Sequence, residues 1–194
     1  MLTKLVDAAV DPVTVEEIKT HLRIDAATED AYLASLITAA RMEAENRLQR
    51  TLIETTWRMT LDSFPDEIEL RMPAILSVIE VRYVDAAGVE QVLAPVDYVL
   101  DNIREPGWIV PAFGEAWPET RDQINAVRVT YTAGYLAGGT NDQRRAAVPM
   151  PIRQWIMLAV GRSYEFREAL VQGQPLQPIG FADSLLDTYR VLTA

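Results

Sequence analysis

The 194-residue chain contains no cysteine and a single histidine, His21. Without cysteine there can be no disulfide bond and no thiolate nucleophile, and a zinc site, which draws mainly on cysteine and histidine, is nearly excluded. A Ser-His-Asp triad would depend on His21 alone. This residue lies near the end of a predicted helix, where an imidazole more often interacts with the last carbonyl groups. The sequence also lacks a run of about 18 apolar residues, the length that a membrane-spanning helix needs.

Positive charge is scarce as well. The chain has 18 Lys and Arg residues against 28 Asp and Glu residues, which gives a formal net charge of −10. An acidic protein is repelled by the phosphate backbone, so sequence-specific DNA binding is disfavoured as its general role. The same charge suits a wall past which DNA slides without adhering. Hydrophobic residues make up 49% of the chain, which is enough for a sizeable core.

Helical signals stand near both ends of the chain. The sequence Thr14–Glu17 is a capping box, and it predicts a first helix at about 14–23. Apolar residues at helical spacing predict a second helix at about 28–50. A pair of prolines tolerated in a first helical turn predicts a third at about 149–169. The glycine-rich stretch 133–148 is expected to be a loop.

The apolar stripe of the second predicted helix also orients its polar residues. Leu33, Ile37 and Ala44 share the face that is expected to be buried. Arg41 and Glu45 are then expected on the solvent side.

Between the second and third helices the hydrophobic period changes from about 3.6 residues to 2, the period of a half-buried strand. The expected strands are Trp57–Leu61, Ile68–Met72, Ile79–Tyr83, Val89–Leu93, Tyr98–Leu100, Trp108–Val110 and Val127–Tyr131. Short strands separated by proline and glycine favour a small antiparallel sheet or sandwich. The sequence therefore predicts an α+β fold: a small α-helical bundle with an inserted antiparallel β sheet or sandwich and a C-terminal amphipathic tail.

The expected division of the chain follows from these elements. It comprises the first part of a helical domain (1–54), an inserted β domain (55–135), the second part of the helical domain (136–171) and a C-terminal docking tail (172–194). An amphipathic segment after a proline-rich stretch either folds back or docks on another chain. The apolar residues of the predicted docking segment are Phe181, Leu185, Leu186, Tyr189 and Leu192.

The remaining candidates for metal or phosphate binding give weak signals. The acidic residues Asp62, Asp66, Glu67 and Glu69 lack an EF-hand pattern and are more typical of a solvated loop and strand face. The basic pair Arg144-Arg145 could contact a phosphate or a partner carboxylate, although such pairs are more often solvated. No catalytic, cofactor-binding or metal-binding residue is predicted. These residues leave two alternatives to a purely structural role. One is a nucleic-acid-binding packaging or tail-assembly factor that uses Arg144 and Arg145, and the other is a carboxylate-dependent hydrolase.

Six segments in order and at characteristic spacing carry a resemblance to a known family. They are residues 14–25, 29–48, 55–65, 77–88, 127–135 and 148–152. Together they resemble the phage head–tail connector (adaptor) family, in its longer members with an inserted β domain. The likeness covers about residues 13–168.

The resemblance implies a structural protein and not an enzyme. Members of this family form a ring, generally of twelve copies, that binds the portal protein and the stopper, head-completion or tail-terminator protein. Duplex DNA passes through the ring without specific binding, and neither a cofactor nor a membrane is implied. By this resemblance Phe181–Leu192 would contact the portal. The protein would be made in the bacterial host cytoplasm and would reside in the virion neck of a phage, a prophage particle or a gene transfer agent.

Overall fold

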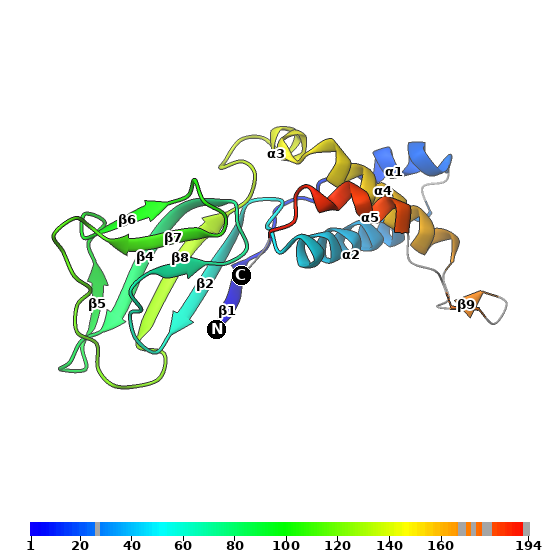
Figure 1. The fold of residues 1–194 in the computed structure, drawn as a ribbon. Coiled ribbons are helices and arrows are strands. Elements are labelled where there is room, and N and C mark those ends of the chain that lie inside the picture. The colour runs from blue at the N-terminus through cyan, green and yellow to red at the C-terminus, as the bar shows by residue number, and fades with distance from the viewer. Residues whose placement is uncertain (26–27, 167–169, 172–173, 176–179, 192–194) are drawn as a thin grey trace.

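The computed structural model describes residues 1–25, 28–166, 170–171, 174–175 and 180–191. A β-rich part and a helical part lie side by side along the long axis of the molecule (Figure 1). The predicted α+β fold is confirmed. Within the described residues, none of the helices is long and apolar enough to cross a membrane.

The helical part packs three helices from opposite ends of the sequence against each other. These are α2 (Asp30–Leu48), α4 (Met150–Glu165) and α5 (Gly180–Asp187), and α1 (Val15–Leu22) contacts both α2 and α4. The predicted capping box is present, because the Thr14 hydroxyl accepts from the Glu17 amide at 3.1 Å while the Glu17 carboxylate accepts from the Thr14 amide at 2.8 Å. The fully buried core of the bundle includes Ile18, Leu33, Leu48, Ile152 and Ile156.

The β part consists of two antiparallel sheets. The five-stranded sheet has the order β1-β2-β8-β4-β5, and the three-stranded sheet has the order β3-β7-β6. The strands are β1 (Leu2–Val6), β2 (Thr55–Leu61), β3 (Ile68–Leu70), β4 (Ile75–Val84), β5 (Glu90–Leu93), β6 (Tyr98–Asp101), β7 (Gly107–Pro111) and β8 (Val127–Ala133). Inward side chains of both sheets form a second core that includes Met59, Ile68, Ile109, Val129 and Tyr131. A two-residue pair of strands, β9 (Leu170–Val171) and β10 (Gln174–Pro175), follows α4.

Two elements differ from the sequence-based expectation. Residues 2–6, expected within the first part of the helical domain, form β1, which pairs with β2 over fifty residues later in the chain. The expected loop 133–148 contains α3 (Asn141–Ala147). This helix begins with a second capping box, in which Thr140 and Gln143 exchange hydrogen bonds. The sequence pattern did not predict α3 because this helix is polar and has no buried residue, and therefore no apolar stripe, and because glycines precede its capping box.

Candidate domain junction and assembly surfaces

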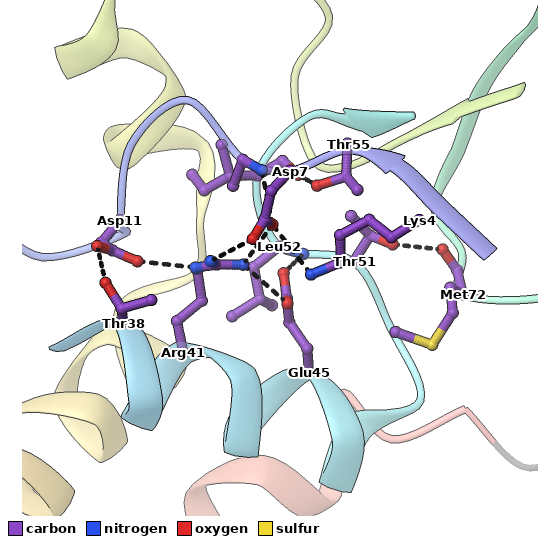
Figure 2. Close-up of polar contacts among 12 residues, drawn as sticks. Lys4, Asp7, Asp11, Thr38, Arg41, Glu45, Thr51, Leu52, Thr55 and Met72 are labelled. Carbon is purple, nitrogen blue, oxygen red and sulfur yellow. Dashed lines mark hydrogen bonds and ion pairs between the residues drawn. The ribbon is translucent and has the colours of Figure 1, made fainter. Parts of the chain in front are cut away.

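The helical and β parts meet around Arg41, a residue of α2 whose side chain is 3% exposed. Its Nε atom donates to Asp11 Oδ1 at 2.7 Å, and its Nη1 atom donates to Glu45 Oε2 at 3.0 Å and to Asp7 Oδ1 at 3.4 Å. Figure 2 shows the guanidinium surrounded by these carboxylates. Arg41 and Glu45 are therefore buried, and the expectation that they lie on the solvent side was wrong.

Charge and burial act together at this network. Burial alone would lower the pKa of the Arg41 guanidinium, but the three carboxylates around it raise that pKa above its ordinary value. Burial raises the pKa of the Glu45 carboxyl, and the neighbouring Arg41 charge offsets this only in part. A buried charge of this kind is stable only while its partners stay in place.

The network joins α2 to the chain segments that precede α1 and follow α2. Asp7 and Asp11 belong to the connection from β1 to α1, whereas Arg41 and Glu45 belong to α2. The second oxygen of Glu45 accepts the backbone N–H of Leu52 at 3.1 Å, in the connection that leads from α2 into β2. Two of the three connections between the helical and β parts, β1 to α1 and α2 to β2, are thus tied to α2, which limits the relative motion of the two parts.

A second joint lies around Arg50, just after α2. Its two terminal nitrogens donate to both carboxylate oxygens of Glu105, in the β6–β7 loop, and its Nε atom donates to the Tyr189 carbonyl at 3.1 Å. The amide of Val191 donates to the Leu48 carbonyl at 3.0 Å. One arginine therefore holds the helical part, the β part and the C-terminal segment together.

The predicted docking segment lies against the bundle in this chain. Leu186 is 5% exposed within the helical core, and Leu185 and Tyr189 are half-buried against it. Asp183 fastens the same helix by accepting from Arg47 at 2.9 Å and from the indole of Trp155 at 3.0 Å. The side chain of Phe181 and all of Leu192 lie outside the described residues. Contact of Leu185, Leu186 and Tyr189 with a portal stays a prediction, and Leu186 could take part only if α5 moved.

The predicted basic pair lies on α3, where both guanidiniums bond within the chain. Arg144 donates to the Gly138 carbonyl at 3.0 Å and to Glu54 at 3.3 Å. Arg145 donates to the Asp11 carbonyl at 3.2 Å and to Asp142 at 3.0 Å. A phosphate would have to compete with these bonds, so the geometry does not favour the nucleic-acid-binding alternative, which stays untested.

The remaining sequence candidates are scattered. His21 is exposed near the end of α1. Asp62 accepts the Asn125 amide at 2.8 Å, and Glu67 lies 4.0 Å from Arg104. In the described part of the chain, no group of three or more His, Cys, Asp or Glu residues is arranged to hold a metal ion.

Residues 12–87 match the family model described as phage gp6-like head-tail connector protein, and this range contains the capping box and the whole Arg41–Glu45 helix. The predicted resemblance to the phage head–tail connector family is confirmed. No curated protein matches this connector chain.

Solved structures similar to the connector come from gene transfer agent (GTA) particles. One is a chain from the "Neck of empty GTA particle computed with C6 symmetry", with 27% sequence identity and a TM-score of 0.79. A chain from the "Virion of native gene transfer agent (GTA) particle" has the same values, and one from the "Neck of native GTA particle computed with C12 symmetry" has a TM-score of 0.75 at 27% identity. Each match covers 100% of this chain and 97% of the other. The expected structural connector role and virion-neck location are thereby confirmed.

Proposed function

We propose that this connector forms a ring of twelve copies in the neck of a phage or phage-like particle. The ring would join the portal to the stopper or tail proteins and enclose the DNA channel. The observation that supports the proposal is the whole-chain similarity to a chain from the neck of a GTA particle, a neck that was computed with C12 symmetry. The role is structural and not enzymatic.

The domain junction suits such an assembly. A closed ring requires every copy to present the same two complementary surfaces at the same angle. A chain of two parts can do so only if those parts are held in one orientation. The buried Arg41 network and the Arg50–Glu105 pair supply this restraint, because each would lose charged hydrogen bonds if the parts rotated.

The charge of the connector fits passage of DNA. With a net charge of −10 on each chain, a ring of twelve copies would carry a net charge of about −120 around the channel. Such a wall repels the phosphate backbone and releases DNA easily. Duplex DNA is therefore a passing contact and not a ligand.

The C-terminal helix is the proposed contact with the portal. In the free chain α5 covers the bundle and the segment after it bonds to Arg50, so docking on a portal would exchange internal contacts for external ones. The segment would therefore leave the bundle only when a portal is present, because the new contacts must offset the internal contacts that are lost.

The test is to mix the purified connector with the portal protein of the same particle and to image the complex by negative-stain microscopy. Full-length protein should add a second ring to the portal, and a variant that ends at Gln172 should not. The truncation also removes Leu186 from the bundle core, so circular dichroism must first show that the shorter chain is folded.

The outcomes test the adaptor role and the role of the C-terminal tail separately. An intact portal that never gains a ring from full-length protein contradicts the adaptor role. If the truncated chain is folded and still adds a ring, the proposed role of the C-terminal tail is wrong and the adaptor role stands. A salt-dependent gel shift of duplex DNA by the connector would instead support the nucleic-acid-binding alternative.

A further inference from the structure

One aromatic side chain projects from the β part without any cover. Phe113 has a relative exposure of 105%, the highest among the large hydrophobic residues described. It lies two residues after β7, in a turn closed by the Glu115 amide donating to the Ala112 carbonyl at 2.9 Å. A side chain added at the next residue, Gly114, would meet nothing within 4 Å, so this turn stands clear of the rest of the chain. Exposed aromatic residues of this kind are typical of interfaces.

The surroundings of Phe113 extend the apolar surface. The Ala112 amide donates to the Asp97 carbonyl at 2.9 Å, which ties the turn to the residues before β6. There Val96 is 80% exposed, and Val99, on the outer strand β6, is 51% exposed. Phe113 is thus the tip of an apolar projection beyond the end of β7, beside the start of β6.

A hollow of suitable character opens at another edge of the β part. Its volume is about 220 Å³, and it is lined by Met1, Leu2, Met59, Leu61, Pro65, Ile68, Glu69 and Arg71. It lies between the outer strand β1 with its neighbour β2 and the outer strand β3 of the other sheet. Pockets for drug-sized ligands have about 300–1,000 Å³, so this hollow is better matched to one large side chain.

The charges beside the two features are complementary. Glu115 and Asp97 flank the projection. Arg71 and the amino group of Met1 lie at the hollow, where Glu69 is the single acidic residue of the lining. Opposite charges at the rim of an apolar contact favour one orientation over others.

The projection does not fill the hollow of its own chain, because the Phe113 side chain is fully exposed. The order β3-β7-β6 places β3 and β6 at the two edges of their sheet, and Figure 1 shows the β6–β7 end lying away from β1. A knob and a pocket at different places on one subunit define a heterologous contact, which propagates from copy to copy and closes into a ring when the rotation permits.

We propose that Phe113 of each connector subunit inserts into the hollow between β1 and β3 of the next subunit. This inference rests on the proposed ring and specifies its interface. Phe113 then acts as the buried aromatic anchor of the contact, and Glu115 faces Arg71 at its rim.

The test compares Phe113→Ala with Ile103→Ala in the portal-mixing experiment. Ile103 is 93% exposed and lies near the other end of β6, so its variant controls for the loss of an exposed apolar side chain. Neither change removes a core contact, and unchanged thermal unfolding should verify this. Phe113→Ala is expected to weaken ring assembly at least about tenfold, as removal of a central aromatic anchor does, while Ile103→Ala assembles like the wild type.

A cross-linking experiment identifies the acceptor site. Because the native chain has no cysteine, the double variant Glu115→Cys/Arg71→Cys carries the only two thiols and retains Phe113. A short bis-maleimide should convert assembled rings into a ladder of linked subunits, whereas either single variant should give no ladder.

The outcomes distinguish this inference from the ring itself. If Phe113→Ala forms rings as well as the wild type, the inference is wrong and the proposed function stands. If Phe113→Ala forms no ring but the double variant gives no ladder, Phe113 contacts another protein and the inference is again wrong. If wild-type protein forms no ring on the portal, the proposed function fails and the inference fails with it.

Discussion

Replacing Arg41 with methionine should destabilise the connector strongly. The substitution keeps most of the apolar side-chain volume but removes the guanidinium that pairs with Glu45, Asp11 and Asp7. Glu45, whose side chain is 5% exposed, is then left as a buried charge without its cation. Breaking a buried pair in this way costs about 3–5 kcal/mol. For a chain of this size, such a loss lowers Tm by roughly 10 °C.

The loss should also depend on pH in a defined direction. Burial already raises the pKa of Glu45 above its ordinary value of 4.5, and removal of the Arg41 charge raises it further. A carboxyl with a raised folded-state pKa stabilises the protein below its unfolded-state pKa and gives up that stability as the pH rises through the folded-state pKa. The variant should therefore lose more stability at pH 8 than at pH 5.

Urea unfolding followed by tryptophan fluorescence at both pH values measures this prediction. Arg82→Met is the matched control, because Arg82 lies on an exposed strand face with Glu80 and Glu90 and its loss should change Tm little. A second variant, Arg41→Met/Glu45→Met, should recover much of the stability, since no buried charge remains. A loss in Arg41→Met no larger than in the control, or no recovery in the double variant, would refute the reasoning.

Three further changes test other parts of the structure. Partial burial raises the pKa of the Glu17 carboxyl, but a backbone amide and the Arg153 guanidinium lower it more, so that the pKa lies below its ordinary value of 4.5. The stability that this carboxyl contributes above that pH is lost as the pH falls through its folded-state pKa, so Glu17→Gln should flatten the acid side of a Tm–pH curve. Tyr131→Phe removes a part-buried 2.6 Å hydrogen bond to the Arg71 backbone carbonyl and should cost about 1 kcal/mol in urea unfolding. Gly134→Ala places a methyl group 2.7 Å from the Glu54 backbone at a φ of +146°, and calorimetry should show a Tm several degrees lower, in keeping with a strain of about 1–3 kcal/mol.

Local signals in the sequence were sufficient for much of the fold. The Thr14–Glu17 capping box predicted the start of α1, and the alternation of Trp57, Met59 and Leu61 predicted β2. These signals work because a cap and a half-buried strand face each depend on residues only a few positions apart. The same local order carried the family resemblance, and hence the connector role and the neck location.

Local signals failed where the partner is distant. Residues 2–6 become β1 because β2 offers them an edge, and nothing within that short segment requires it. The apolar stripe of α2 predicted that Arg41 faces solvent. In the structure, Asp7 and Asp11 from the β1–α1 connection pair with Arg41 and bury it. The tail left two options open on sequence alone, and the bundle decided between them for the free chain by covering Leu186.

The sequence by itself therefore determined most of the connector's elements and their order, since these follow from periodicity, capping and spacing along the chain, and its motifs carried the family resemblance. The tertiary structure alone decided how the two parts are joined and which surfaces remain free. An ion pair such as Arg50–Glu105 and a projection such as Phe113 depend on which segments meet and which stay uncovered. That is set by packing between residues far apart in the chain, which leaves no local pattern in the sequence.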